Sequence, residues 1–112
     1  RSYAQEMGGW QFYSEPNAIW FLAFYESKIV GFCAAFRRKT HIFWDNFYVL
    51  PDYRGFGISK GLTDVRNDYC KQFEKEIRCI TDNPIQMRNY KRIGLRQYGM
   101  RGRYSKFRSV CD

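Results

Sequence analysis

Several chemistries are excluded by what this sequence has little of. It contains one histidine, His41, and its four cysteines form no Cys-x-x-Cys pair, so a Cys/His zinc site cannot be assembled. No stretch approaches the roughly 20 uninterrupted apolar residues of a membrane-spanning helix. We therefore expect no metal, no membrane partner, and reduced cysteines that are mostly buried.

Signals at the N-terminus are also missing. The chain begins with Arg1 rather than methionine, and no charged, apolar and small-residue signal peptide follows. A cytoplasmic location is the default expectation, and the start at Arg1 suggests that the chain has been cut. With 112 residues and 13.5 kDa, residues 1–112 are expected to form a single domain.

Negative charge is scarce in the C-terminal part of the chain. From Asn83 onward there are eight basic residues and one acid, Asp112. This segment therefore carries +7 of the chain's net charge of +8. Clustered positive charge attracts anions, which include cofactor phosphates, nucleic acid and acidic proteins. Charge alone does not choose among these partners.

Three apolar, aromatic runs in the first half predict neighbouring antiparallel strands. Ile19–Tyr25 and Ile29–Phe36 form a hairpin, and a third strand over Ile42–Leu50 ends at Pro51. Before them, residues 1–7 are expected to be the end of a helix, and Ser14–Asn17 a loop.

Helical periodicity replaces the strand pattern after this point. The apolar residues from Ile58 to Phe73 recur every three or four positions, which predicts a helix. Its polar face is expected to carry Lys60, Asp64, Arg66, Asn67 and Lys71.

The last third of the chain predicts a strand, a helix and further strands. Glu76–Thr81 is a short apolar strand, and Asn83-Pro84 is typical of the start of a helix that runs to Ile93 and ends at Gly94. One or two more strands are expected between Leu95 and Val110.

A glycine-rich turn joins the third strand to the first helix. In Arg54-Gly55-Phe56-Gly57-Ile58-Ser59-Lys60, the glycines allow close backbone approach, and the N–H groups at the helix start point toward an anion. Arg54 and Lys60 add positive charge. The turn therefore indicates a phosphate site, although a purely structural turn is equally consistent with two glycines.

Three motifs in order resemble the GNAT superfamily of acetyl-CoA-dependent N-acetyltransferases. The segment Val49–Ser59 matches the family's strand, Pro and (Arg/Gln)-x-x-Gly-x-(Gly/Ala) stretch, except that Ser59 replaces Gly or Ala. Downstream, Asn83, Tyr90 and Gly94-Leu95 fall at family spacings, and Lys28–Phe32 is similar to the turn into the family's third strand. The resemblance covers roughly Ile19 to Tyr98.

The resemblance implies an α+β fold: a mixed, mostly antiparallel, twisted sheet with flanking helices and coenzyme A in a V-shaped split between two central strands. The N-terminal strand and two helices of the family are not visible, so part of the fold is expected to be missing. The backbone of Phe47, Tyr48 and Val49 would pair with the pantetheine arm of acetyl-CoA. The pyrophosphate would lie on the N–H groups from Phe56 to Lys60. The implied cofactor-binding residues are Phe47, Tyr48, Val49, Arg54, Gly55, Phe56, Gly57, Ile58, Ser59, Lys60 and Asn83.

For the chemistry, the resemblance implies direct attack of an amine on the acetyl thioester. Tyr90 would donate a proton to the leaving thiolate, although a core tyrosine explains the same position. Asp45 is the candidate general base, because Phe43, Asp45, Phe47 and Val49 are expected to alternate onto one face; an acid at a solvated strand end is the alternative. His41 has a suitable intrinsic pKa but lies at the outer end of this strand.

The acceptor would be a primary amine: a protein lysine, a chain terminus or a small molecule. The basic C-terminal region could add an acidic partner, and a homodimer is a further candidate assembly. Two other functions stay open. Basic residues interleaved with aromatics from Arg96 to Arg108 also suit a nucleic-acid-binding module, and a family member could bind acetyl-CoA without turnover.

Overall fold

The computed structural model of the chain describes residues 9–109, with side chains from residue 11 onward. These residues form one seven-stranded sheet, two α-helices and two short 3₁₀ helices. The elements in chain order are β1 (Gly9–Glu15), β2 (Ala18–Tyr25), β3 (Lys28–Arg37), β4 (His41–Val49), η1 (Pro51–Tyr53), α2 (Ile58–Cys70), η2 (Lys71–Phe73), β5 (Glu76–Thr81), α3 (Pro84–Arg92), β6 (Arg96–Arg101) and β7 (Tyr104–Arg108).

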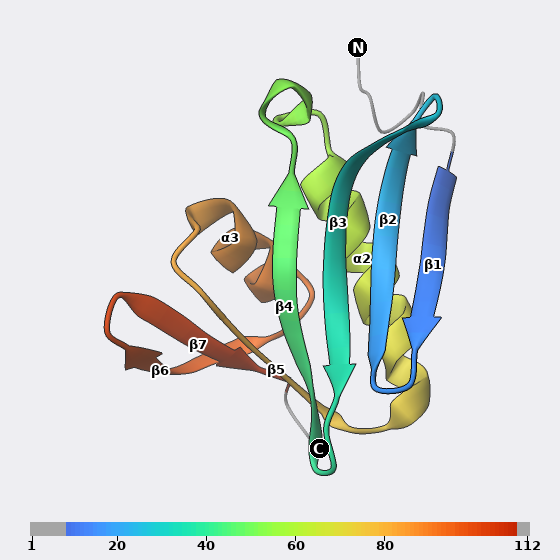
Figure 1. Cartoon of the computed structure of the whole chain (residues 1–112). Helices are drawn as coiled ribbons and strands as arrows, with labels where there is room; N and C mark the ends of the chain where they lie inside the picture. Colours follow the sequence, from blue (N-terminus) through green and yellow to red (C-terminus); the bar gives the residue numbers. More distant parts are fainter. Residues whose placement is uncertain (1–8, 110–112) are drawn as a thin grey trace.

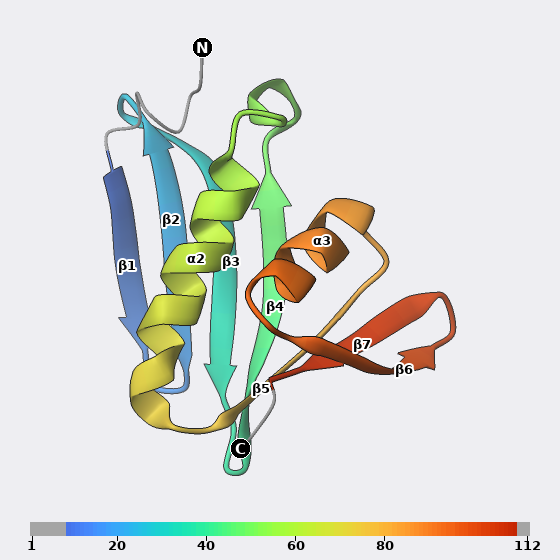
Figure 2. The same ribbon diagram turned by 180° about the vertical axis from the view of Figure 1, so that it is seen from behind.

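The strand order in the sheet is β1-β2-β3-β4-β5-β7-β6, and every neighbouring pair is antiparallel except β4 and β5, which are parallel. The two α-helices pack on the same side of this sheet, as the opposite views in Figures 1 and 2 show. The predicted α+β fold, with a mixed and mostly antiparallel sheet and flanking helices, is confirmed. Among residues 9–109, no helix has both the length and the apolar character needed to cross a membrane.

The main difference from the sequence prediction lies before β2. Ser14 and Glu15, expected in a loop, belong to strand β1, which pairs with β2 from Gly9↔Phe24 to Glu15↔Ala18. The side chains from Gln11 to Glu15 are all exposed, although the Phe12 ring contacts the rings of Phe21 and Tyr69, so this part of the edge strand gives no alternation of buried and exposed residues. The helix end expected over residues 1–7 lies outside the described residues.

Helix α2 packs closely on the sheet because β3 has a glycine beneath it. A Cβ on Gly31 would lie 3.2 Å from the Leu62 side chain and 3.3 Å from that of Ile58. On the same helix, Arg66 is completely buried rather than on the polar face. The prediction was wrong because Ile58, Leu62, Arg66 and Cys70 follow one another at intervals of four, which places all of them on the buried side of the helix.

A β-bulge in β4 overturns the expected alternation of Phe43, Asp45, Phe47 and Val49. The register against β3 shifts between Ala34↔Asp45 and Phe32↔Tyr48, and Asn46 has a left-handed φ of 56°. The extra residue moves the side chains after it to the opposite face. Phe47 and Val49 therefore pack against the core, whereas Asp45 is exposed.

The parallel pairing of β4 with β5 is short. It runs from His41↔Glu76 to Trp44↔Cys79, and the later residues of the two strands separate. Strand β5 continues instead beside β7, from Arg78↔Arg108 to Thr81↔Ser105. The predicted V-shaped split between two central strands is therefore present.

Candidate active site

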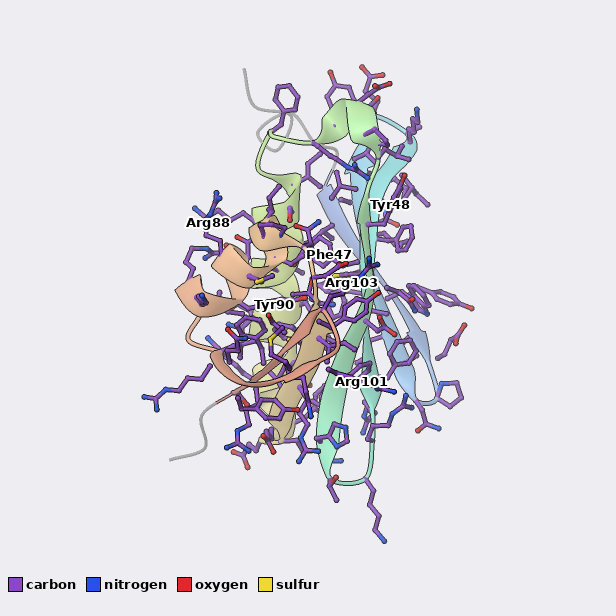
Figure 3. All side chains as sticks on the ribbon, turned by 90° about the vertical axis from the view of Figure 1, so that its left-hand side faces the viewer. Phe47, Tyr48, Arg88, Tyr90, Arg101 and Arg103 are labelled. Carbon is purple, nitrogen blue, oxygen red and sulfur yellow. The ribbon has the colours of Figure 1, made fainter. Side chains whose placement is uncertain are left out.

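A cleft of about 650 Å³ lies where β4 and β5 separate. One wall is β4 after its last pairing with β5, and the other comes from the end of β5 and from α3. Figure 3 shows side chains from both walls, Phe47 and Tyr48 on β4 and Arg88 and Tyr90 on α3. The lining residues are Trp44–Val49, Tyr53–Gly55, Gly57, Ser59, Lys60, Ile80–Asn83, Ile85, Gln86, Arg88–Tyr90 and Tyr104.

The glycine-rich turn closes one end of this cleft. Gly57 has a φ of 89° and is the N-cap of α2, whose first backbone hydrogen bond runs from Gly61 N to Gly57 O at 3.0 Å. The amides of Ile58, Ser59 and Lys60 precede that bond, so they have no acceptor within the helix. This end of the cleft can therefore bind an anion through backbone N–H groups and the helix dipole.

Arg54 connects the turn to β4. Its Nε donates to the Val49 carbonyl at 2.8 Å, and its guanidinium lies 5.3 Å from the centre of the Tyr48 ring. The charge of Arg54 is thus fixed beside the mouth of the cleft. The bond also occupies the Val49 carbonyl, which leaves Phe47 and Tyr48 as the better backbone partners for a ligand.

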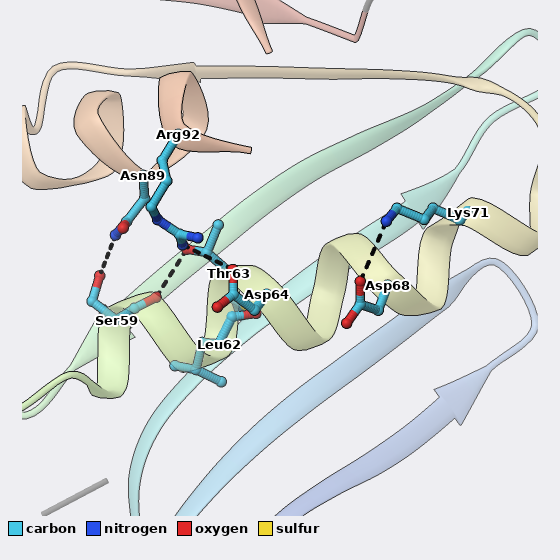
Figure 4. Close-up of polar contacts among 9 residues, drawn as sticks. Ser59, Leu62, Thr63, Asp64, Asp68, Lys71, Asn89 and Arg92 are labelled. Atoms are coloured by element: carbon cyan, nitrogen blue, oxygen red, sulfur yellow. Dashed lines mark hydrogen bonds and ion pairs between the residues drawn. The ribbon is translucent and has the colours of Figure 1, made fainter. Parts of the chain in front are cut away.

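Ser59 links the start of α2 to α3 through its hydroxyl group. That oxygen accepts hydrogen bonds from Gln86 Nε2 at 3.2 Å and from Asn89 Nδ2 at 3.3 Å, and Figure 4 draws the Asn89 contact. Both amide side chains are buried, and the Gln86 Oε1 atom has no hydrogen-bond partner among residues 9–109. Ser59 is therefore more than a small substitute for Gly or Ala, because its hydroxyl satisfies two buried donors.

Asn83 performs the capping role that the sequence predicts. Its Oδ1 accepts from the backbone N of Ile85 at 2.8 Å and of Gln86 at 3.3 Å, and Pro84 follows at the first helical position. Asn83 also lines the cleft. A contact with a cofactor stays a prediction.

Tyr90 reaches the cleft from α3 with its ring held between aromatic neighbours. The ring centre lies 5.9 Å from that of Trp44 and 5.7 Å from that of Phe107. Its hydroxyl accepts a hydrogen bond from Arg66 Nη2 at 3.1 Å. Burial raises the pKa of the Tyr90 phenol, whereas the Arg66 guanidinium acts in the opposite direction. The phenol therefore keeps its proton at neutral pH and can act as a donor.

The two candidate bases are at different ends of β4. Asp45 lines the cleft, is exposed, and accepts a hydrogen bond at Oδ1 from the Asn46 backbone N at 2.8 Å. His41 lies outside the lining, at the paired end of β4. Partial burial and the nearby Arg78 lower the pKa of His41. Only Asp45 is placed to act in the cleft.

Most residues predicted to bind the cofactor come together here. Of the eleven residues predicted to bind the cofactor, nine line the cleft, and Phe56 and Ile58 do not. For these two the prediction concerned only the backbone N–H groups. The Ile58 side chain lies in the core. The sequence reasoning missed Gln86, Asn89 and Arg66. The four-residue spacing of Arg66 from Leu62 and Cys70 was the signal that could have found it.

Among residues 9–109, no group of His, Cys, Asp or Glu side chains could hold a metal ion.

A family model described as "Acetyltransferase (GNAT) family" matches residues 2–95 of the chain. The chain belongs to the GNAT acetyltransferase family. A search of curated proteins by sequence found no match.

Solved structures of several acetyltransferases share this fold. The PaiA N-acetyltransferase from Thermoplasma acidophilum, in complex with coenzyme A, superposes with a TM-score of 0.73 at 19% identity, over 83% of this chain and 60% of that one. Naa50 from Arabidopsis thaliana, with the bisubstrate analogue CoA-Ac-MVNAL, gives 0.68 at 24% identity, over 83% and 72%. The ribosomal-protein-S18-alanine N-acetyltransferase from Escherichia coli gives 0.73 at 14% identity, over 96% and 84%. The chain thus spans between 60% and 84% of the length of these three GNAT structures.

Proposed function

We propose that this protein binds acetyl-CoA and transfers its acetyl group to a primary amine by direct attack. The observation that carries the proposal is the cleft between the separated ends of β4 and β5, which is closed at one end by the Gly57 turn and the N-terminus of α2. Family membership and the neighbours that hold coenzyme A or a coenzyme A analogue support the same cofactor.

In this proposal the pyrophosphate binds at the start of α2, on the amides up to Lys60 and beside Arg54. The pantetheine arm lies along β4 and pairs with the backbone of Phe47 and Tyr48, as a further strand would. Residues after Trp44 are not paired with β5, so the cofactor would take the place of the missing strand. Asn83 would approach the arm from α3.

Two side chains would handle protons. An amine with a pKa of about 10.4 is mostly charged at neutral pH, and its deprotonation costs roughly 4–5 kcal/mol. Asp45, directly or through water, would accept that proton, and Tyr90 would supply one to the leaving thiolate. Tyr90 is buried, which suits a proton donor that keeps its proton until the reaction. Asp45 is exposed, which suits a proton acceptor that exchanges protons with water.

The central test is calorimetry with acetyl-CoA on the full-length protein and its Gly57→Glu variant. A glutamate at Gly57 places bulk and negative charge at the proposed pyrophosphate position, so we expect a loss of affinity of at least about tenfold, or 1.4 kcal/mol. Gly102→Glu is the matched control, because Gly102 also has a positive φ, of 60°, but lies outside the cleft lining. Equal affinity of the Gly57→Glu variant and the wild type would contradict the proposal.

A turnover assay with a panel of amines decides between an enzyme and a binding protein. Binding of acetyl-CoA without acetylation of lysine peptides, peptide N-termini or polyamines would indicate a non-catalytic member of the family. Two neighbours favour peptide amines in this panel: one is named for the alanine of a ribosomal protein, and the other holds a peptide joined to coenzyme A.

The charge around the cleft favours an acceptor with an acidic flank. Arg101 and Arg103 lie on the β6–β7 hairpin beside the opening (Figure 3), and Arg103 Nε forms an ion pair with Asp82 Oδ2 at 3.1 Å. Among residues 9–109, Arg101 forms no ion pair. Opposite charges steer an acceptor toward this side. Reversal of Arg101, Arg103 and Arg108 to Glu should weaken acceptor use and leave acetyl-CoA affinity unchanged.

The matched control for this triple variant reverses Lys39, Lys71 and Lys75, which are exposed like the three arginines but lie outside the β6–β7 hairpin. If both triple variants lose acceptor use equally, or if cofactor affinity falls in parallel, the acidic-acceptor proposal is wrong. A homodimer and a cytoplasmic location stay expectations, to be checked by light scattering and cell fractionation.

A further inference from the structure

A completely buried guanidinium lies directly behind the cleft. Arg66 of α2 has no solvent exposure, and it donates from Nη1 to the Ala34 carbonyl at 3.0 Å and from Nη2 to the Tyr90 hydroxyl at 3.1 Å. Its contacts thus join α2 to β3 on one side and to α3 on the other. A lining residue of the cleft is one of its two hydrogen-bond acceptors.

No acid neutralises this charge within the described part of the chain. The ion pairs among residues 9–109 all use other cations, and Arg66 Nε has no hydrogen-bond partner. The guanidinium lies 4.2 Å from the centre of the Trp44 ring and 5.2 Å from that of Phe47. Burying a charge without a counter-ion is costly, and an apolar side chain would fill the same space at a lower cost. Packing alone therefore does not explain an arginine at position 66.

The titratable groups that face this cation are weak acids. They are the thiols of Cys33 on β3 and Cys79 on β5 and the phenol of Tyr90, while Cys70 is a further thiol on α2 itself. Burial raises the pKa of Cys33 to about 11 and of Cys79 to about 12, so both thiols are neutral at physiological pH. Tyr90 differs from them because it alone lines the cleft.

The direction of the Arg66–Tyr90 hydrogen bond decides what the phenol can do. The hydroxyl oxygen accepts from Arg66, so the hydroxyl proton points elsewhere. The rings of Trp44 and Phe107 hold the tyrosine in place. A buried phenol without a nearby cation would be a poor acid, since its anion would be left in an apolar environment.

We propose that Arg66 is a positioning residue that makes Tyr90 usable as the proton donor, because it orients the hydroxyl and stabilises the phenolate left after donation. This inference rests on the proposed acetyl transfer. The amine nitrogen bonds to the acetyl carbonyl carbon, the C–S bond breaks, and its electron pair stays on sulfur. Sulfur takes the Tyr90 proton, and the phenolate beside Arg66 later regains the proton that the acetylated nitrogen releases through water.

The first test is a double-mutant cycle in the full-length protein with Arg66→Gln and Tyr90→Phe. Each single variant should lower kcat by about 100-fold, at the lower end of the range for general acids, while acetyl-CoA affinity changes less than about threefold. The double variant should be no worse than either single variant by more than about threefold, because both act in one step. Multiplied losses, or an unchanged kcat in Arg66→Gln, would overturn the inference.

Arg66→Lys separates charge from packing. Lysine keeps a cation at the site, so the kcat of Arg66→Lys should be at least about tenfold higher than that of Arg66→Gln. If Arg66 acted only by packing, the two variants would not differ in this way. Urea unfolding of each variant shows whether it is folded. If Arg66→Gln does not fold, Arg66→Met, an uncharged side chain of similar length, takes its place in the kcat comparison and in the measurement below.

A second readout is independent of turnover. A difluorinated tyrosine, which is more acidic than tyrosine, is placed at position 90 and titrated by ¹⁹F NMR. Its midpoint should rise by at least about one pH unit in Arg66→Gln and return toward wild type in Arg66→Lys. Equal midpoints would overturn the role of Arg66 even if acetyl transfer is confirmed. A shifted midpoint in a protein that acetylates nothing would instead contradict the proposed function.

Discussion

The hydroxyl oxygen of Ser59 lies 3.3 Å from Asn89 Nδ2 and accepts its hydrogen bond, so the first turn of α2 is fixed to α3. A second contact joins the same helices farther along α2, where Arg92 and Asp64 form an ion pair at 2.8 Å. The end of the cleft where we propose that the pyrophosphate binds is therefore held against the helix that carries Tyr90.

Replacing Ser59 by the alanine common in the family should destabilise this protein. Ser59→Ala leaves the buried amides of Gln86 and Asn89 without their acceptor, at a cost of about 1–3 kcal/mol. Urea unfolding measures the change in the free energy of unfolding. The control, Ser27→Ala in the exposed β2–β3 turn, should stay within about 0.5 kcal/mol of wild type. Equal stability of the two variants would show that the Ser59 bonds contribute nothing.

Gly94 should be needed for its backbone conformation alone. It has a φ of 94°, and a Cβ there would meet no atom of the described part of the chain within 4 Å. Gly94→Ala should therefore cost about 1–2 kcal/mol through the left-handed conformation and without any clash. Gly99→Ala is the control: Gly99 lacks a positive φ, and its Cβ would approach only Lys106, at 4.0 Å. Thermal unfolding should show a lower Tm for the first variant only.

The bulge at Asn46 should matter for both stability and activity. A β-branched residue is strained at a φ of 56°, so Asn46→Val should cost about 1–3 kcal/mol and disturb the β4 wall of the cleft. Asn46→Gly accepts this φ and should keep acetyl-CoA affinity. Calorimetry measures the thermal stability of both variants and their affinity for acetyl-CoA. A valine variant that is as stable and binds as well as the glycine variant would rule out a strained backbone at this position.

Stability should fall at alkaline pH because of buried thiols. Burial raises the pKa of Cys33 from 9.0 to about 11 and that of Cys79 from 9.0 to about 12. Above pH 9 the unfolded chain loses these protons while the folded chain keeps them, so the folded state binds more protons and becomes less stable as pH rises. The stabilisation that the protonated thiols give the folded state is complete below pH 9 and decreases as the pH rises toward 11. Urea unfolding at pH 8 and pH 10 measures it, and Cys33→Ala should reduce the slope.

Local patterns predicted most of the fold. Strands β2, β3 and β4 could be recognised as apolar, aromatic runs, and α2 could be recognised because its apolar residues recur every three or four positions. Strand β1 could not, because its exposed side chains give no pattern and only its pairing with β2 defines it. The glycine turn and the Asn83 cap were also readable, since a special backbone conformation requires particular residues.

The candidate site was predictable only in part, because some of its residues depend on contacts between distant elements. The Asn46 bulge reversed the orientation of Phe47 relative to Asp45, and an asparagine inside a strand, although it tolerates a positive φ, does not by itself predict a bulge. Arg66 was misread because a charged residue is normally exposed, and its burial depends on the Ala34 carbonyl and the Tyr90 hydroxyl, which come from other parts of the chain.

The short parallel pairing between β4 and β5 has a mechanical consequence. Beyond Trp44 and Cys79 the sheet is a fork: one prong carries β1–β4 and α2, and the other carries β5–β7 and α3. A ligand that pairs with β4 as a strand would bridge both prongs. Bound acetyl-CoA should therefore slow amide hydrogen exchange in β5 and α3 as well as in β4, so that the cofactor acts as a brace for the whole sheet.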